Sequence, residues 1–377
     1  MRARVGINAS IIGGNPTGLG VYSIKLIREL DRIRDDLVVY TSYTEALGPL
    51  RAQIVRVPAA TRPEHSVRGH FARLLWLQSV LWVQARINHL GVILNTVPEG
   101  VLGSPIPQVT VVHDLLPLFF PAEYPRQQYY FRFLVPRLLQ ASRIVVADSE
   151  STRRNIIRYF GLPPGNVRVI YPGHDPEAYF CDGFDPSPHW HGEPYLLYVG
   201  NLLPHKNLLR LLDAVAILRR RTPCRLVIRG EGRPAYARAL HERVETLGLG
   251  AAVTFLGYTA ESKLRELYTR AAGFVLPSLG EGFGLPVLEA MACGTPVVTA
   301  NTSSLPEVVG DAALQVDPND AIGPADAVHR VLTDRDLRED LRRRGFERAA
   351  LFSWRRTAEQ VSRLLDEVGT AERLEVL

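Results

Sequence analysis

Two glutamates stand eight positions apart in residues 280–298, a stretch that reads GEGFGLPVLEAMACGTPVV. Glu281 is the second residue of this stretch and Glu289 lies near its middle. Pro286 suits the first position of a helix, which is expected to run to about Cys293. A carboxylate accepts hydrogen bonds from paired hydroxyl groups, such as those of a ribose or a hexose. The spacing therefore indicates one carboxylate on each side of a helix start.

The residues just before that helix predict an anion-binding loop, made of Gly282, Phe283, Gly284 and Leu285. Backbone N–H groups at a helix N-terminus carry partial positive charge, which favours an anion such as a diphosphate. Glycine lets the backbone approach such a group closely. With one acid on either side, the loop suits a nucleotide sugar, in which a diphosphate joins a hexose to a ribose.

Two other kinds of site remain conceivable for the paired glutamates. A glycosidase needs two carboxylates that face one bond, but a loop rich in backbone amides suits phosphate better. A metal site would need clustered acidic ligands. The Asp-x-Asp pair, Asp334 and Asp336, lies on a charged helix face and is interpreted as surface.

Glycines also follow the first predicted strand, where Gly18 and Gly20 precede a helix. They could admit a phosphate to that helix N-terminus, or simply form a turn without a ligand. A dinucleotide-binding fingerprint would need a third glycine where Ser23 stands, and an acidic residue at the end of the second strand. Neither is present, so NAD binding is disfavoured.

Three more polar residues lie after predicted strands. His113 ends the segment VVH and could donate to a sugar hydroxyl, although a lone histidine is often structural. Asn201 and Lys206 fall in YVGNLLPHKN, where a lysine can neutralise phosphate and an asparagine can donate an amide hydrogen bond. The alternative for Lys206 is an ordinary surface lysine.

The elements that would position these residues alternate between strands and helices, which predicts parallel sheets in an α/β fold. Strands are expected at 4–10, 37–42, 54–58, 108–114, 143–149, 167–173, 195–201, 224–232, 253–258, 273–278 and 296–301. We expect one domain at 1–172, a linker at 173–194 and a second domain at 195–353. A helix at about 354–377 has apolar residues at helical spacing: Val361, Leu364, Leu365 and Val368.

The charge of the chain is uneven. Residues 1–180 hold 20 Lys and Arg against 13 Asp and Glu, a balance of +7, whereas 181–377 hold 24 against 26. The basic half suggests an anionic surface or substrate, or only a solvated arginine-rich surface. No nucleic-acid-binding motif is found. The segment 66–88 mixes Trp, Leu and Arg, which predicts a helix that docks on an anionic membrane or packs on the sheet.

Three cysteines without metal-binding spacing suit a reducing cytoplasm. We expect no signal peptide and no spanning helix.

These motifs together resemble the retaining glycosyltransferases of family GT4, which have the GT-B fold: two Rossmann-like domains facing each other across a cleft. The resemblance covers about residues 5–310 and is carried, in order, by GLGVYS, VVHDLLPLFFP, RIVVADSESTRRNI, YVGNLLPHKN, LVIRGEG and EGFGLPVLEAMACGTPV. In that fold the last helix crosses back to the N-terminal domain.

The resemblance implies a role for each candidate residue. Glu281 would contact the donor hexose and Glu289 the ribose, while Lys206 would neutralise the leaving diphosphate. The amides of Phe283, Gly284 and Leu285 would face the sugar and phosphates. The resemblance also places Gly18 and Gly20 by the diphosphate, His113 by the hexose, and Gly230 and Tyr258 by the base. Many relatives have an arginine where Asn201 stands, so this chain lacks one cation there.

The implied reaction is retaining transfer of a hexose by front-face substitution, without a cofactor or metal. GDP-mannose is the first expectation for the donor. UDP-sugars, or an epimerase of similar fold, are the alternatives. The acceptor would be a glycan, a lipid-linked glycan or a small molecule, and the enzyme would be cytoplasmic, with contact to the inner face of the membrane.

Overall fold

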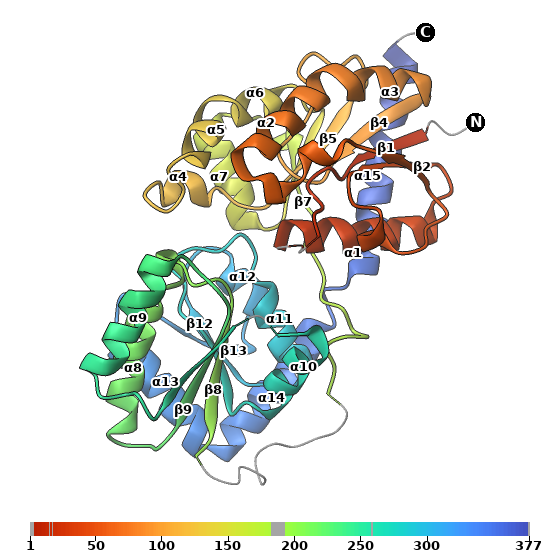
Figure 1. The fold of residues 1–377 in the computed structure, drawn as a ribbon. Helices are drawn as coiled ribbons and strands as arrows, with labels where there is room; N and C mark the ends of the chain where they lie inside the picture. Colours follow the sequence, from red (N-terminus) through yellow and green to blue (C-terminus); the bar gives the residue numbers. More distant parts are fainter. Residues whose placement is uncertain (1–3, 15, 17, 182–192, 258, 376–377) are drawn as a thin grey trace. The chain divides into compact units, whose positions relative to one another are not determined.

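The chain forms two compact units in a computed structural model, which describes residues 4–14, 16, 18–181, 193–257 and 259–375. Unit 1 comprises Met1–Gly173 together with Trp354–Leu377, and unit 2 comprises His174–Ser353. Each unit contains a parallel sheet with helices packed against it (Figure 1).

The sheet of unit 1 has seven strands in the order β3-β2-β1-β4-β5-β6-β7. Its strands are β1 Arg4–Asn8, β2 Leu37–Thr41, β3 Gln53–Arg56, β4 Leu90–Asn95, β5 Gln108–Val112, β6 Ile144–Ala147 and β7 Val167–Val169. From β1 the chain first adds strands on one side and then, from β4, on the other. Ligands of such sheets bind at this switch point, outside the carboxyl ends of the strands.

The α-helices of unit 1 are α1 Gly18–Ile33, α2 Ser66–Trp76, α3 Trp82–Ile87, α4 Leu116–Phe119, α5 Gln127–Phe133, α6 Val135–Gln140, α7 Glu150–Phe160 and α15 Trp354–Glu375. A π-helical turn, η4 Leu77–Leu81, joins α2 to α3. Short 3₁₀ turns are η1 Glu45–Leu47, η2 Ala59–Thr61, η3 Pro63–His65 and η5 Pro164–Asn166. Helix α7 is capped by Ser149 and ends at Gly161, which is left-handed.

Helix α15 packs on unit 1 although it ends the chain, and Figure 1 shows it in blue beside the red α1. Its four apolar residues with helical spacing are all buried: Val361, Leu364, Leu365 and Val368. The buried guanidinium of Arg34 donates to the Asp366 carboxylate over 2.9 Å, which fixes α15 against the end of α1. The predicted helix is therefore present.

The sheet of unit 2 has six strands in the order β10-β9-β8-β11-β12-β13, so its switch point lies between β8 and β11. Its strands are β8 Tyr195–Val199, β9 Arg225–Arg229, β10 Val253–Leu256, β11 Gly273–Leu276, β12 Val297–Ala300 and β13 Ala313–Val316. The 3₁₀ turn η6 spans Pro204–Lys206. The α-helices are α8 Leu208–Arg219, α9 Pro234–Thr246, α10 Glu261–Arg270, α11 Leu285–Ala292, α12 Leu305–Val309, α13 Ile322–Thr333 and α14 Arg335–Ala349.

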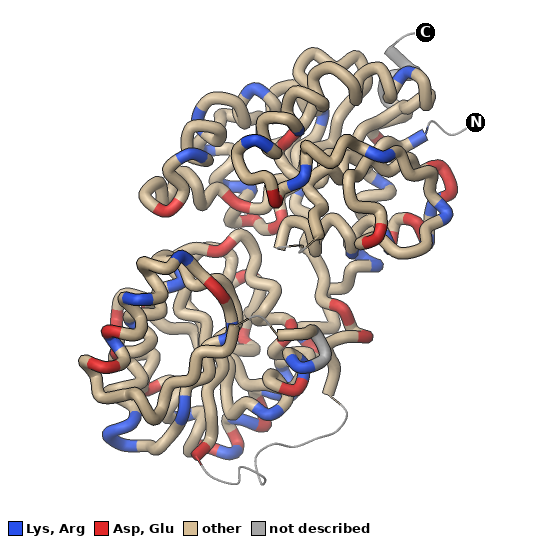
Figure 2. The backbone as a smooth tube through the Cα atoms, viewed as in Figure 1, with Lys and Arg blue, Asp and Glu red and all other residues tan. Residues whose placement is uncertain are grey.

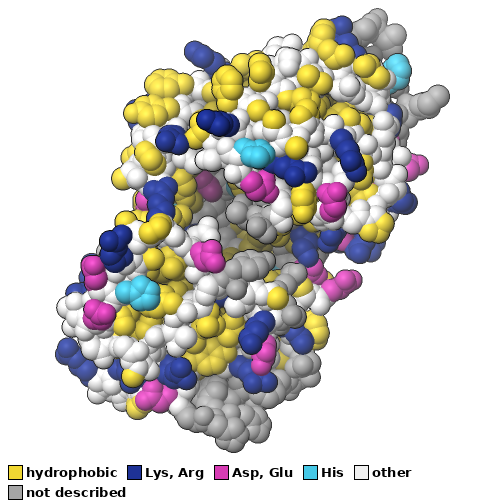
Figure 3. Space-filling model, viewed as in Figure 1, with side chains coloured by type: hydrophobic (Ala, Val, Ile, Leu, Met, Phe, Trp, Pro, Cys, Tyr) yellow, Lys and Arg dark blue, Asp and Glu magenta, His cyan; other side chains and the backbone are white. Residues whose placement is uncertain are grey.

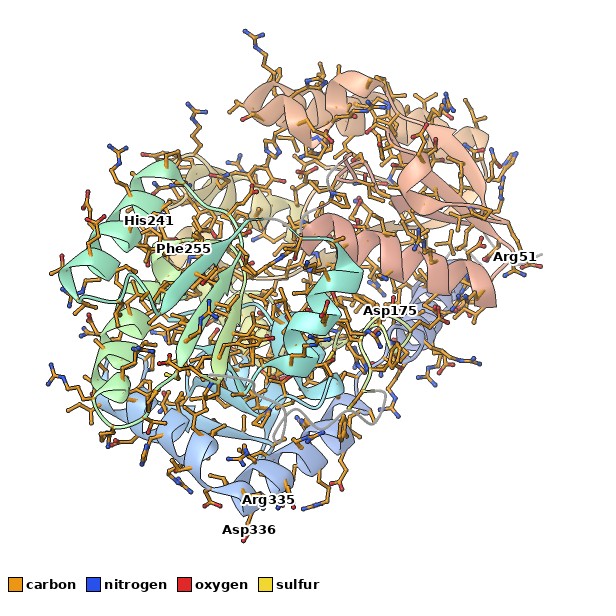
Figure 4. All side chains as sticks on the ribbon, turned by 60° about the horizontal axis from the view of Figure 1, so that its bottom comes forward. Arg51, Asp175, His241, Phe255, Arg335 and Asp336 are labelled. Atoms are coloured by element: carbon orange, nitrogen blue, oxygen red, sulfur yellow. The ribbon has the colours of Figure 1, made fainter. Side chains whose placement is uncertain are left out.

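One continuous apolar core holds unit 2 together, with Tyr198, Tyr268 and Phe274 among its fully buried side chains. Helix α9 covers the edge of the sheet, where His241 lies against Phe255 with ring centroids 4.3 Å apart (Figure 4). The expected linker at 173–194 begins with residues that belong to unit 2, since Tyr179 joins this core. Residues 182–192 lie outside the described residues.

The eleven predicted strands coincide with observed strands, but β4 and β13 were not predicted. Strand β4 is the central strand of unit 1, between β1 and β5, and most of it is buried. A short, nearly continuous apolar run can be interpreted either as a strand or as the end of a helix. The run that forms β4 directly follows a helical segment, which favoured the helix. Burial of the strand in the middle of the sheet resolves that ambiguity.

Candidate active site

Lys206 and Glu281, two of the predicted site residues, form an ion pair in unit 2. The Lys206 ammonium donates to both carboxylate oxygens of Glu281, at 2.7 and 2.8 Å. Both side chains are largely shielded, with 15% and 11% of their surfaces exposed. The hydroxyl of Ser278 also donates to Glu281 Oε1 over 2.7 Å. The lysine and the glutamate are therefore held in fixed positions before any ligand arrives.

The topology of the sheet explains why residues 75 positions apart meet. Lys206 lies after β8 and Glu281 lies after β11, and these two strands pair in parallel, with Phe274 opposite Leu197. Their carboxyl ends consequently lie at the same edge, on either side of the switch point of unit 2. Asn207 fixes the lysine loop: its backbone is left-handed, and its amide donates to the Pro277 and Pro318 carbonyls.

The loop after Glu281 leads into α11 as predicted, with Pro286 in the first turn. Gly284 precedes the helix with φ +107°, a conformation that favours glycine. Two hydroxyls from the loop after β12 hold the loop that precedes α11. Ser303 donates to the Glu281 carbonyl at 2.6 Å, and Ser304 donates to the Phe283 carbonyl at 3.0 Å. These bonds use loop carbonyls, not the amides at the start of α11.

Glu289 lies on α11, half-buried, where its Oε2 accepts a 2.9 Å hydrogen bond from the Tyr268 hydroxyl. Burial, and then the charge of Glu289, raise the pKa of Tyr268 well above its ordinary value. Tyr268 thus remains a neutral donor that orients the carboxylate. The structure holds Glu281 and Glu289 by separate sets of contacts, which fits two binding groups better than one acid–base pair.

The remaining candidates of unit 2 lie at the ends of β8 and β9. Asn201 is exposed, and its carbonyl accepts a hydrogen bond from Tyr198. Gly230 has φ +148° and lies so close to the neighbouring strand end that a Cβ would come within 1.9 Å of the Gly200 carbonyl oxygen. Tyr258 falls outside the described residues.

In unit 1, His113 lies directly after β5 and is buried. Its Nδ1 is 2.6 Å from Asp148 Oδ2, and its Nε2–H donates to the Thr96 carbonyl over 2.8 Å. The ring also meets Tyr22 of α1 edge-on, with centroids 4.5 Å apart. Both ring nitrogens are therefore engaged within unit 1, so a sugar hydroxyl would have to replace one of these partners.

The charge state of His113 follows from these contacts. Burial lowers the pKa of its imidazole, but the carboxylate of Asp148 and the two hydrogen bonds outweigh burial, so the pKa of His113 is raised. A carbonyl can only accept, so Nε2 must carry a proton. Around neutral pH the arrangement favours an imidazolium that faces the Asp148 carboxylate.

Gly18 and Gly20 lie in the first turn of α1, so the helix starts at these glycines and not after them. Gly18 is exposed and a Cβ there would meet no atom within 4 Å, whereas Gly20 is buried and a Cβ would meet Pro16. The helix start lies after β1, beside the switch point of unit 1. The tight packing explains the glycine at position 20, and the structure gives no steric reason for the one at 18.

Asp148 and Ser278 touch predicted site residues but were missed. Asp148 follows β6 as His113 follows β5, and the two strands pair in parallel with Val112 opposite Ala147. The residues that directly follow these two positions, His113 and Asp148, must therefore lie side by side. The order of the strands was the missing information, because the sequence shows strand ends but not which strands are neighbours.

The part of the chain that the structure describes offers neither a metal centre nor a membrane-spanning helix. It holds no cluster of three or more His, Cys, Asp or Glu side chains arranged to bind a metal. No helix in it combines the length and apolar character needed to cross a membrane.

Two Rossmann-like units, each built on a parallel sheet, define the class of proteins with the GT-B fold. Known structures support the fold. Sucrose-phosphate synthase from Thermosynechococcus elongatus superposes with a TM-score of 0.79 at 21% identity, covering 98% of this chain and 100% of that one. The Anabaena protein HepE, solved with UDP and glucose, gives 0.76 at 21% identity, covering 96% and 99%.

Sequence comparisons identify the family. Residues 16–178 match the family described as Glycosyltransferase Family 4, and residues 184–348 match Glycosyl transferases group 1. The chain is 30% identical to O-antigen chain mannosyltransferase B of Escherichia coli, over 90% of this chain and 93% of that protein. It is 29% identical to O-antigen chain mannosyltransferase RfbU of Salmonella typhimurium, over 83% and 87%.

The chain therefore belongs to glycosyltransferase family 4. The predicted family, fold and enzyme class, that of a hexosyltransferase, are confirmed.

Proposed function

We propose that this enzyme transfers a hexose from a nucleotide diphosphate sugar with retention of configuration, and that unit 2 binds the donor. The observation that carries the proposal is the Lys206–Glu281 pair at the switch point, next to the N-terminus of α11. It combines a cation, a carboxylate and backbone N–H groups at the edge where α/β sheets bind ligands. These are the groups that a diphosphate and a sugar need.

The donor would be held by three kinds of contact. The amides of Phe283, Gly284 and Leu285 would face the diphosphate at the start of α11. Lys206 has three N–H donors, of which the hydrogen bonds to Glu281 use two, so it can add a bond to phosphate. A carboxylate has about four acceptor positions, so Glu281, which accepts three bonds, can also bind a sugar hydroxyl.

Departure of the nucleoside diphosphate would be the main barrier, because negative charge develops on its phosphate. Lys206 and the α11 amides would stabilise that charge. We propose front-face substitution, in which the acceptor hydroxyl attacks from the side of the leaving group and a phosphate oxygen takes its proton. Glu281 serves as a binding group in this scheme, since its carboxylate is already neutralised by Lys206. The scheme uses no metal.

His113 of unit 1 would contribute as a cationic sugar-binding residue. Its imidazolium, kept charged by Asp148, is suited to donate a hydrogen bond or to stabilise negative charge, but not to accept a proton. We accordingly assign it a binding role and do not assign it the role of a general base. Asp148 is a positioning residue for it.

Mannose from GDP-mannose is the proposed donor group, supported by the two O-antigen mannosyltransferase relatives that align along most of the chain. Their names also support a growing glycan as acceptor, which we propose to be lipid-linked and reached at the cytoplasmic face of the membrane. UDP-sugar transfer, or epimerisation of a nucleotide sugar, is the competing reaction.

A donor panel tests the assignment. Thermal unfolding is recorded with GDP-mannose, UDP-glucose and ADP-glucose, and the largest stabilisation is expected with GDP-mannose, because bound ligand stabilises the folded state by mass action. NMR of the transferred sugar should show the anomeric configuration of the donor, with and without EDTA. An inverted product would refute the mechanism, stabilisation by UDP-glucose alone would refute the donor, and loss of transfer in EDTA would refute metal independence.

A further inference from the structure

Unit 1 exposes a row of apolar side chains along the continuous helical segment formed by α2, η4 and α3. The segment spans residues 66–87, about 33 Å at 1.5 Å per residue. The exposed residues are Val67 at 50%, Phe71 at 69%, Leu75 at 60%, Val80 at 38%, Val83 at 43% and Ile87 at 63%. We call these six residues the apolar stripe. A row of this length is unusual, because exposed apolar residues in a soluble domain are commonly scattered.

The π-helical turn keeps the stripe on one face. Residues in an α-helix are about 100° apart, so Val80 would lie about 140° beyond Leu75 in an uninterrupted helix. The wider turn η4 takes up one extra residue and rotates the following segment back by about 100°. Val80 lies inside the turn and gains only part of this rotation, whereas Val83 and Ile87, which follow the turn, return to within about 20° of Leu75.

The opposite face of this segment already supplies the core of unit 1, so the stripe is not needed for folding. Trp76, Leu77, Leu81 and Ala85 are buried against the sheet. The buried Arg73 guanidinium anchors the segment by donating to both oxygens of Glu99, at 2.5 and 2.9 Å. The prediction that residues 66–88 pack on the sheet is therefore confirmed for one face, and a second apolar face stays in solvent.

The charged side chains of the segment itself are all positive. Residues 65–98 contain no Asp or Glu. Arg68 and Arg86 are exposed and fall within the angular range of the stripe, and the Arg86 guanidinium lies 4.1 Å from the Trp82 ring centroid. Apolar residues interspersed with arginine on an exposed helix face are typical of helices that lie in a membrane interface.

Helix α5 extends this surface. It meets α2 where the Tyr130 and His70 rings lie 4.8 Å apart, and it exposes Tyr129 and Phe133 at 57% and 60%. Residues 124–147 also lack Asp and Glu and carry four arginines. Figure 3 shows hydrophobic side chains with Lys and Arg between them over this edge of unit 1, and Figure 2 shows the basic positions along its helices.

We propose that the apolar stripe, with Arg68 and Arg86, docks unit 1 on the headgroup region of a bilayer that contains anionic lipid. A bilayer is favoured over a protein partner because the surface is long, combines bulky apolar residues with arginine, and has no acidic side chain to pair with a mixed-charge protein surface. The inference does not depend on the transferase reaction, since lipid binding and donor binding are measured separately.

Vesicle flotation with the full chain tests the proposal, using phosphatidylcholine vesicles with and without 30% phosphatidylglycerol. Binding is expected only to the anionic vesicles and should weaken as salt is raised. A triple variant with Phe71→Ser, Leu75→Ser and Ile87→Ser should lose at least about tenfold in partitioning. In the double variant Arg68→Gln and Arg86→Gln, partitioning onto anionic vesicles should fall about fivefold for each arginine removed.

Matched controls come from unit 2. Ile322 is 59% exposed, as Ile87 is 63%, and Arg335 projects from the outer face of α14 (Figure 4). Ile322→Ser and Arg335→Gln should leave binding unchanged. The proposal is overturned if the wild-type chain does not float with anionic vesicles, or if the controls reduce binding as much as the stripe variants. It is also overturned if the stripe variants only change the chain from dimer to monomer in light scattering.

Discussion

At the scale of single residues, the main feature is that one cation and one carboxylate neutralise each other before the donor binds. Lys206 is one of three lysines in the chain, and Asn201, which lies in the same loop, carries no charge. The leaving diphosphate would therefore depend on Lys206 and on the α11 amides more heavily than in a site with two cations.

Replacing this lysine should slow transfer without unfolding the protein. In Lys206→Ala the leaving phosphate loses its cation, and we expect the single-turnover rate to fall by about 10²–10³. Lys263→Ala removes an exposed lysine of the same unit and serves as the control. Wild-type transfer by Lys206→Ala, measured with saturating donor, would contradict the assigned role.

The buried imidazolium of unit 1 predicts a pH effect on stability. Because the pKa of His113 is raised in the folded state, its contribution to stability is complete below its unfolded pKa of about 6.5 and is lost as pH rises through the folded value. Asp148→Asn removes the carboxylate that raises this pKa. The stability difference between wild type and Asp148→Asn should therefore shrink from pH 6 to pH 9 in chemical unfolding, and a difference that grows would reject the charged pair.

At the scale of elements, parallel strand ends decide which residues meet. Strand β8 brings Lys206, and strand β11 brings Glu281, to one edge. The sequence indicated both loops, because each follows a strand and precedes a helix. It did not show that His113 would meet Asp148, since that contact depends on β5 and β6 being neighbours. It also missed β4, the strand whose following residue, Thr96, accepts the other His113 hydrogen bond.

The close approach of β8 and β9 makes Gly230 a sensitive position. Gly230→Ala would place a Cβ against the Gly200 carbonyl and keep a backbone conformation that favours glycine, at a cost of about 2–4 kcal/mol in the free energy of unfolding. Gly250→Ala is the matched control, because no atom lies within 4 Å of its Cβ position. Chemical unfolding compares the two, and equal stability of both variants would show that the strand ends can separate freely.

At the scale of the whole molecule, the last helix belongs to unit 1 although unit 2 precedes it in the chain. Burial of Val361 and Leu365 against α1, and the Arg34–Asp366 bond, make α15 part of the unit 1 core. The folded form of unit 1 therefore requires both ends of the chain.

A core substitution in α15 should consequently weaken unit 1. Leu365→Ala leaves a cavity and should lower the free energy of unfolding by about 2–5 kcal/mol. Hydrogen exchange should rise in peptides of unit 1, such as 18–33, and stay unchanged in peptides of unit 2. Leu351→Ala, at a half-exposed leucine of unit 2, is the control. Faster exchange in unit 2 alone would mean that α15 does not stabilise unit 1.

The sequence by itself determined the α/β class, most of the strands, the family and the loop between Glu281 and Glu289, because these depend on local patterns and on ordered motifs. Only the tertiary structure decided that Lys206 pairs with Glu281, that Tyr268 holds Glu289, and that His113 is enclosed by Asp148 and Thr96. It also decided that the helical segment of residues 66–87 has two apolar faces, since a π turn shifts the register that a sequence pattern assumes. The physical reason is that strand order and burial join residues far apart in the chain, whereas periodicity reports only on neighbours.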